Sequence, residues 1–119
     1  MSAESPVLIL HNPRCSKSRA TLELLEARGV HAQVVHYLVD PPSTGQIESI
    51  LDRLGIEPRA LMRRDEAEYA ELGLDDPALT RAELVAAMHA HPRLIQRPIV
   101  LANGRAAIGR PPEAVLDIL

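Results

Sequence analysis

The chain has 119 residues, a formal net charge of −3 and 46% hydrophobic residues, a size suited to one domain with one core. No stretch approaches the roughly 18 apolar residues of a membrane-spanning helix. No signal-peptide pattern precedes the first predicted strand, so we expect a cytoplasmic protein without a membrane partner. The acidic balance and the lack of Phe and Trp argue against nucleic-acid binding. One cysteine, Cys15, cannot form an internal disulfide, which fits a reducing compartment.

The first 40 residues predict a strand, a helix and a second strand. The apolar run Val7–Leu10 is typical of a strand, Ser16–Arg28 has helical periodicity and ends at Gly29, and His31–Leu38 is a second strand pattern. The apolar positions of the helix fall on one face, at Ala20, Leu24 and Ala27. Such a βαβ unit implies parallel strands with a right-handed crossover.

The middle of the chain, approximately residues 43–91, predicts a helical insertion in a single domain of residues 1–119. Ser43-x-x-Gln46 and Thr80-x-x-Glu83 are capping-box patterns, each followed by apolar residues at helical spacing. A further short helix is predicted over Pro58–Arg64. We find no linker composition that would indicate a second domain.

The last third returns to strand patterns. Ile99–Ala102 and Arg105–Ile108 flank Asn103-Gly104, the pair preferred in a type I′ hairpin because both positions need a positive φ. A short terminal helix is predicted over Glu113–Leu119. The order βαβ, helices, ββα indicates an α/β protein with a mixed four-stranded sheet and helices on both faces.

Cys15 lies in the polar run His11–Arg19, at the start of the first predicted helix. Unpaired N–H groups and the positive end of the helix dipole favour a thiolate there, and Arg14 and Lys17 add positive charge. Lowering a pKa by one unit needs about 1.36 kcal/mol, more than the ~0.3–1 kcal/mol typical of the dipole, so further cations are required. A cysteine that merely fills the core is expected among apolar neighbours, and these flanks are charged.

Five strings along the chain carry a family resemblance. They are His-Asn-Pro-Arg-Cys-Ser at 11–16, Tyr-Leu-x-x-Pro-Pro at 37–42, Arg-Ala-Leu-Met-Arg at 59–63, Arg-Pro-Ile-Val at 97–100 and Gly-Arg-Pro-Pro-Glu at 109–113. In this order they resemble the glutaredoxin-linked arsenate reductase family (ArsC-like, of the thioredoxin-like superfamily). The length is similar to that of the shorter, chromosomal-type members.

The resemblance implies a thioredoxin-like fold and assigns the site residues. Cys15 corresponds to the nucleophile and His11 to a histidine that helps to stabilise the thiolate. Arg63, Arg97 and Arg110 correspond to the arginines that bind the oxyanion. Pro98 falls where this fold places a cis proline opposite the active cysteine. Supporting roles fall to Asn12, Ser16 and Ser18.

The chemistry of arsenate agrees with this assignment. A tetrahedral oxyanion needs several bidentate donors and fixed N–H groups, which three guanidinium groups and a helix N-terminus supply. The same cations would hold Cys15 ionised. We expect Arg59 and Arg64 to lie in solvent and Asp65–Glu71 to form a solvated acidic face. The histidines lack a zinc-ligand spacing, so no metal is expected.

The resemblance predicts reduction of arsenate to arsenite with glutathione as co-substrate, glutaredoxin as partner and no bound cofactor. Two alternatives stay open: a glutathione-dependent thiol/disulfide reductase with another substrate, and a redox-responsive regulator that binds RNA polymerase. The regulators usually carry Cys-x-x-Cys, and here Ser18 takes the second position. A phosphatase-type arsenate reductase is excluded, because Cys-x5-Arg is required and the residue six after Cys15 is Thr21.

Overall fold

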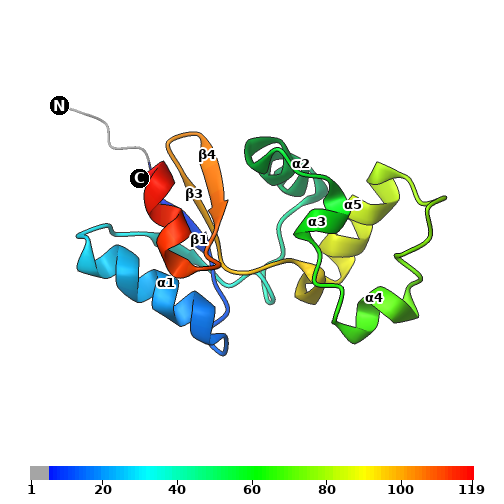
Figure 1. Cartoon of the computed structure of the whole chain (residues 1–119), viewed down its shortest axis with the longest axis horizontal. Helices are drawn as coiled ribbons and strands as arrows, with labels where there is room; N and C mark the ends of the chain where they lie inside the picture. The colour runs from blue at the N-terminus through cyan, green and yellow to red at the C-terminus, as the bar shows by residue number, and fades with distance from the viewer. Residues whose placement is uncertain (1–5) are drawn as a thin grey trace. The chain divides into compact units, whose positions relative to one another are not determined.

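The computed structural model describes residues 6–119, which divide into two compact units. Unit 1 comprises the described residues up to Tyr37 together with Arg97–Leu119, and unit 2 comprises Leu38–Gln96 (Figure 1). Unit 2 contains the predicted insertion 43–91 and extends beyond it at both ends. The prediction that both belong to a single domain stays a prediction, and each unit is described by itself.

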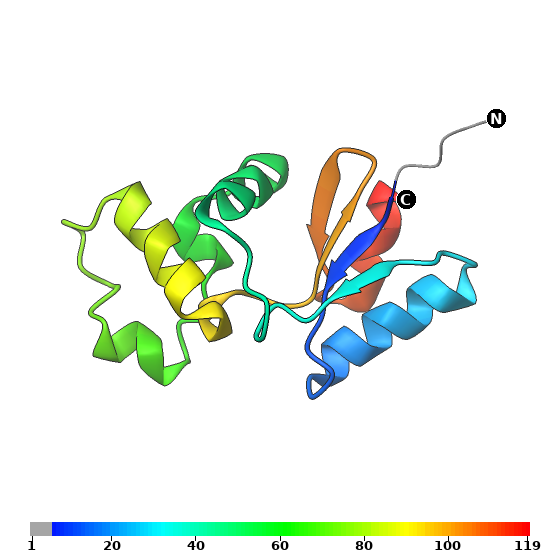
Figure 2. The same cartoon turned by 180° about the vertical axis from the view of Figure 1, so that it is seen from behind.

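Unit 1 is built on a four-stranded sheet with the order β2-β1-β3-β4. The strands are β1 (Leu8–Leu10), β2 (Gln33–Val35), β3 (Ile99–Ala102) and β4 (Arg105–Ile108). β1 is parallel to β2 and antiparallel to β3, and β3 is antiparallel to β4 (Figure 2). The predicted mixed sheet is therefore confirmed, with a shorter second strand than the His31–Leu38 pattern indicated.

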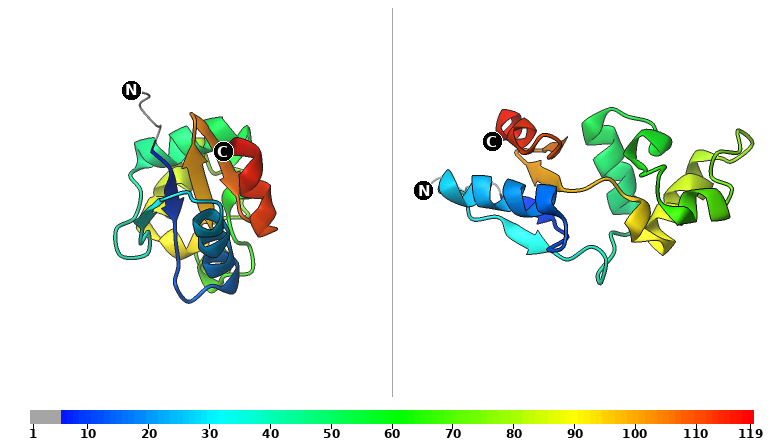
Figure 3. Two further views of the ribbon diagram at one scale, coloured as in Figure 1. Left: turned by 90° about the vertical axis from the view of Figure 1, so that its left-hand side faces the viewer. Right: turned by 60° about the horizontal axis from the view of Figure 1, so that its bottom comes forward.

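Two helical elements cover one face of this sheet. They are α1 (Ser16–Ala27) and the 3-10 helix η2 (Pro112–Ile118), which pack against each other (Figure 3). The core between them and the sheet consists of buried apolar side chains, namely Ile9, Leu25, Val100, Ala102, Val115 and Ile118. Helices on both faces were predicted, and the described residues of unit 1 supply them on one face.

The buried face of α1 differs from the predicted one. Ser18, Thr21 and Leu25 are buried, whereas Ala20 and Ala27 are exposed. Burial of the two hydroxyl groups is possible because both are hydrogen-bonded: Ser18 Oγ to the His11 ring, and Thr21 Oγ1 to the Lys17 carbonyl at 2.8 Å. The buried face of α1 therefore carries polar side chains, and it is not the face that the spacing of the apolar residues predicted.

The two predicted chain reversals in unit 1 are confirmed. Gly29 follows α1 with φ +73°, a conformation that only glycine adopts without strain. Asn103 and Gly104 have φ values of 54° and 71° between β3 and β4, as a type I′ hairpin requires.

Unit 2 is helical. Its elements are α2 (Thr44–Leu54), α3 (Pro58–Leu61), α4 (Ala67–Glu71), α5 (Arg81–Ala90) and the 3-10 helix η1 (Pro92–Leu94). Both predicted capping boxes are present, because Ser43 and Thr80 accept from the N–H groups of Gln46 and Glu83. α5 packs against α2 and α3. Over residues 6–119, no helix has the length and apolarity needed to cross a membrane.

The helix α3 ends earlier than predicted. It stops at Leu61 instead of Arg64, because the next residues pair with a distant segment. Met62 forms an antiparallel bridge with Ile95, and the Arg63 N–H donates to the Leu94 carbonyl at 2.6 Å. Arg63 therefore lies in an extended segment held by long-range hydrogen bonds.

Candidate active site

Cys15 is the N-cap residue of α1, directly before its first turn. A tight turn brings it there: the Cys15 N–H donates to the Asn12 carbonyl, and the Arg14 N–H donates to Asn12 Oδ1, both at 3.0 Å. Asn12 thus shapes the loop that presents the thiol. The cysteine side chain is partly exposed, so a substrate can reach its sulfur.

The surroundings of Cys15 favour its thiolate. Burial alone raises the pKa of the thiol, but the backbone N–H groups of Ser18 and Lys17 lower it, as do the charge and the hydrogen bonding of the Arg97 guanidinium. The net result is a pKa below the ordinary value. Lys17 acts through its backbone, whereas the sequence pointed to its charged side chain. The helix N-terminus therefore lowers the pKa of Cys15 as predicted, and Arg97, which is distant from Cys15 in the sequence, lowers it further.

His11 and Ser18 connect the loop to α1. His11 is buried, and its Nδ1 lies 2.6 Å from Ser18 Oγ, which also accepts the Asn12 N–H at 3.0 Å. Burial lowers the pKa of His11, and the nearby charges of His36 and Arg19 lower it further. A neutral ring at pH 7 acts through hydrogen bonding more than through charge. Its predicted influence on the thiolate would pass through Ser18, whose N–H faces the sulfur.

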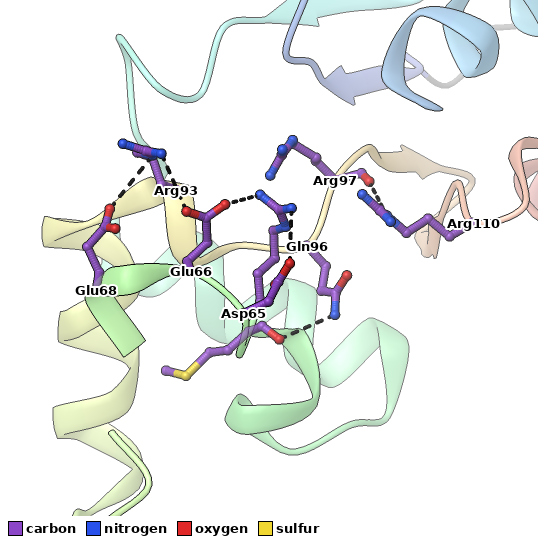
Figure 4. Close-up of polar contacts among 9 residues, drawn as sticks. Asp65, Glu66, Glu68, Arg93, Gln96, Arg97 and Arg110 are labelled. Atoms are coloured by element: carbon purple, nitrogen blue, oxygen red, sulfur yellow. Dashed lines mark hydrogen bonds and ion pairs between the residues drawn. The ribbon is translucent and has the colours of Figure 1, made fainter. Parts of the chain in front are cut away.

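Arg97 and Arg110 lie together in unit 1. Arg110 Nε donates to the Arg97 carbonyl at 2.8 Å, and Figure 4 shows the Arg97 guanidinium pointing away from that contact. The Arg97–Pro98 peptide bond is cis, as predicted. The structure thus joins Arg97 to Cys15 through its side chain and to Arg110 through its backbone.

Gly109 supports this arrangement and was missed by the sequence reasoning. Its N–H donates to the Pro98 carbonyl at 2.9 Å. A Cβ atom at this position would lie 2.5 Å from Thr21 Oγ1 and 2.7 Å from Pro98 Cγ. Only glycine lets the Arg110 segment approach α1 and Pro98 this closely. The one available signal was its place directly before Arg110 in the Gly-Arg-Pro-Pro-Glu string.

Arg63, the third predicted oxyanion ligand, lies in unit 2 and is bound to carboxylates. Its Nη1 forms an ion pair with Glu66 Oε1, and its Nη2 lies 3.8 Å from Asp65 Oδ2. Glu66 and Glu68 are only 15% and 20% exposed and Tyr69 is buried, so the prediction that Asp65–Glu71 forms a solvated face is wrong for these three residues. The overlooked signal was the short separation of Arg63 and Glu66, which lie across a turn closed by the Glu66 N–H and the Arg63 carbonyl. The role of Arg63 in oxyanion binding stays a prediction.

The remaining predicted residues need one correction. Arg59 is not free in solvent, because Nε donates to the Leu74 carbonyl at 3.0 Å and Nη2 to the Asp76 carbonyl at 2.6 Å. Arg64 is exposed as predicted, and Ser16, the first residue of α1, is exposed. Within the described part of the chain, no cluster of three or more His, Cys, Asp or Glu residues could hold a metal ion.

Comparisons with known proteins agree with these features. The chain matches the ArsC family over residues 10–118. This chain belongs to the ArsC family. An arsenate reductase of Neisseria meningitidis serogroup A is 51% identical over 114 residues, which cover 95% of this chain and 97% of that protein. The Escherichia coli K12 protein described as uncharacterized protein YfgD is also 51% identical, over 95% of this chain and 96% of its own length.

A solved structure extends the agreement to the fold of this ArsC-family chain. An arsenate reductase from Vibrio cholerae has a TM-score of 0.95 and 51% identity, and the match covers 98% of this chain and 100% of that one. The predicted family and the thioredoxin-like fold are therefore confirmed. A partly exposed cysteine with a lowered pKa can attack a tetrahedral oxyanion, and helix N–H groups and arginine side chains can bind one.

Proposed function

We propose that this chain is an arsenate reductase in which Cys15 is the nucleophile. The observation that carries the proposal is the Cys15 thiol at the N-cap of α1, with its pKa lowered by the N–H groups of Ser18 and Lys17 and by Arg97. Membership of the ArsC family and 51% identity to a protein named arsenate reductase support the same reaction.

In the first step, the Cys15 thiolate attacks the arsenic atom of arsenate. A sulfur–arsenic bond forms, one arsenic–oxygen bond breaks, and the departing oxygen leaves as water after protonation. Because arsenate is an anion, the attacking thiolate meets repulsion, which guanidinium groups offset. Arg97 suits this role because it already acts on the sulfur, and Arg110 is hydrogen-bonded to its carbonyl.

Arg63 completes the proposed set of oxyanion ligands. Support comes from the Arg-Ala-Leu-Met-Arg string and from a backbone anchored by the Leu94 and Ile95 contacts. An anchored arginine loses less conformational entropy on binding an anion than a free surface arginine does. Its guanidinium is held by Glu66 in the absence of substrate.

Glutathione is proposed as the reductant, because this chain has one cysteine and no resolving thiol. The glutathione thiolate attacks Cys15 Sγ, a sulfur–sulfur bond forms and the sulfur–arsenic bond breaks. Its electron pair passes to arsenic, which is reduced from the +5 to the +3 state, and the two sulfurs are oxidised to a mixed disulfide. A glutaredoxin thiolate then takes the glutathione and restores Cys15.

The test is an assay of arsenite formation from arsenate with glutathione and glutaredoxin, each omitted in turn. Wild-type protein should form arsenite only in the complete mixture, and Cys15→Ser should form none while keeping the far-UV circular dichroism of the wild type. Appreciable arsenite from Cys15→Ser would contradict the proposal.

A parallel arm separates the reaction from general thiol chemistry. The same protein is offered a glutathionylated test disulfide in place of arsenate. Reduction of the disulfide without any turnover of arsenate would replace the proposal by a thiol/disulfide reductase activity. If arsenate is still reduced when glutaredoxin is omitted, Cys15 remains the proposed nucleophile. The last step, in which glutaredoxin removes glutathione from Cys15, would then be wrong.

A further inference from the structure

We propose that Glu66 is an internal counter-ion of the oxyanion site: it occupies Arg63 until a doubly charged oxyanion displaces it onto Arg93. Glu66 would then determine both the affinity for substrate and the selection against singly charged anions. The inference rests on the proposed role of Arg63 as an oxyanion ligand. It concerns contacts within unit 2.

Glu66 is shared between two guanidinium groups. Its Oε1 pairs with Arg63 Nη1, and its Oε2 lies 3.4 Å from Arg93 Nη2. Arg93 Nε lies 3.8 Å from Glu68 Oε2, and Arg63 Nη2 lies 3.8 Å from Asp65 Oδ2, so two arginines and three carboxylates form one network. Figure 4 shows Arg93 between Glu66 and Glu68. Each Glu66 oxygen thus already has a different cationic partner.

The carboxylates of this network outnumber its arginines, which is unusual for an anion site. Arg63 and Arg93 carry two positive charges, and Asp65, Glu66 and Glu68 carry three negative ones. An incoming oxyanion would therefore meet no net attraction from the network while Glu66 stays on Arg63. Arg63 and Glu66 are 16% and 15% exposed, so their pair is screened less by water than a surface pair. An oxyanion that binds Arg63 must replace this carboxylate.

Displacement is feasible because only a side chain has to move. Glu66 is the N-cap residue of α4, its N–H donates to the Arg63 carbonyl at 3.2 Å, and its side chain caps no N–H of that helix. The Arg93 side chain is 65% exposed and free to follow the carboxylate. Glu66 would therefore leave Arg63 without becoming a buried unpaired charge, which would be costly.

The exchange favours doubly charged ligands. A singly charged anion such as nitrate offers Arg63 no more charge than the carboxylate that it must replace. An arsenate or phosphate dianion offers more charge and can bind a guanidinium with two oxygens. Glu66 would thus keep common monoanions out of the site and lower the affinity for substrate at the same time.

The test compares Glu66→Gln with Glu48→Gln. The amide that replaces the Glu66 carboxylate would keep the shape and the hydrogen-bonding ability of the side chain but not its charge. Glu48 is a matched control in the same unit, because it pairs with Arg81 at 2.7 Å outside the proposed site. We expect Glu66→Gln to lower the KM for arsenate about fivefold with kcat unchanged, which corresponds to about 1 kcal/mol. Nitrate should become a competitive inhibitor of this variant, and Glu48→Gln should behave as the wild type does.

Three outcomes would overturn the inference. The first is an unchanged KM for arsenate in Glu66→Gln. The second is a raised KM in the same variant, which would mean that Glu66 positions Arg63. The third is an equal change of KM in Glu48→Gln. Arg63→Ala is measured in parallel. An unchanged KM there would overturn both the inference and the proposed role of Arg63.

A second readout does not depend on turnover. Inorganic phosphate should protect Cys15 from alkylation by iodoacetamide, and Glu66→Gln should lower the protecting concentration about fivefold. If the wild type fails to reduce arsenate but this shift occurs, the proposed function fails and the inference stands. If arsenate is reduced and neither KM nor protection shifts, the inference fails alone.

Discussion

Arg97 in unit 1 and Arg63 in unit 2 are the same type of residue in opposite electrostatic settings. The Arg97 guanidinium acts on the Cys15 thiol and lowers its pKa. The Arg63 guanidinium faces the carboxylate of Glu66, with Asp65 nearby. One arginine thus has a charge that is free to act on the reacting group, whereas the charge of the other is already matched.

The difference shows that a count of arginines does not measure the positive field of a site. The N-cap position of Cys15 lowers the pKa of its thiol. The Arg97 charge lowers it further, because no described carboxylate forms an ion pair with Arg97. Arg63 has a pairing partner three residues away, so its field is largely cancelled at a distance. We therefore expect Arg97 to serve the thiolate and the oxyanion, and Arg63 to serve the oxyanion alone.

The largest expected effect on activity comes from replacing Arg97 and Arg63 by alanine, one at a time. Arg97→Ala should lower arsenate reductase activity about a hundredfold, since it removes a donor at the reacting atoms. It should also raise the pKa of Cys15, so that alkylation by iodoacetamide requires a higher pH. Arg63→Ala should raise the KM for arsenate and leave the pH profile of alkylation where it is.

The two alkylation profiles decide this prediction. They are measured on both variants and the wild type over the same pH range, with circular dichroism to verify the fold. A profile that shifts equally in both variants would show that Arg63 also acts on the thiol. An unshifted profile in Arg97→Ala would remove Arg97 from the account of the thiolate.

A second comparison concerns one glycine from each unit. Gly109→Ala would place a Cβ 2.5 Å from Thr21 Oγ1 and 2.7 Å from Pro98 Cγ, so α1 or the Pro98 segment must shift. We expect a loss of about 2 kcal/mol in the free energy of unfolding, typical of overpacking. Gly45→Ala is the control, because the nearest atom to its Cβ is Ser43 Oγ at 3.9 Å.

Urea denaturation of the two glycine variants provides the measurement. Gly45 lies in the first turn of α2, where alanine costs less conformational entropy than glycine, so this variant should be at least as stable as the wild type. Equal stabilities of the two variants would mean that the contact of Gly109 with Thr21 and Pro98 relaxes without cost.

Local patterns were predictable from the sequence, and contacts between distant segments were not. The capping boxes at Ser43 and Thr80 and the Asn103-Gly104 hairpin depend on residues within a few positions of each other. The position of Cys15 before a helix followed from the same kind of local pattern. These features need no knowledge of what packs against them.

The errors share a cause in long-range pairing. Thr21 is buried on α1 where Gly109 approaches it closely, and nothing near Thr21 in the sequence shows this. Similarly, α3 ends before Arg63 because Met62 pairs with Ile95. Arg59 was expected in solvent and instead binds carbonyl groups about 15 residues further along the chain.

The smallest expected effect is a pH dependence of stability that belongs to unit 1. The pKa of Cys15 in the folded chain lies below its ordinary value of 9.0, so the unfolded chain binds more protons between those two pH values. The free energy of unfolding should therefore rise with pH through that window, remain higher above it, and fall again as the pH drops through the lowered pKa.

Cys15→Ser has no thiol to ionise and should lack this increment. The measurement is urea denaturation of both proteins under reducing conditions from about pH 6 to about pH 9, with the difference between them plotted against pH. The difference should grow with pH in favour of the wild type. In Arg97→Ala the growth should be smaller, because one of the groups that lower the thiol pKa is gone, while the N–H groups of Ser18 and Lys17 remain. In Arg63→Ala the growth should equal that of the wild type, since Glu66 matches the Arg63 charge. Parallel curves for wild type and Cys15→Ser would mean that the folded chain does not favour the thiolate.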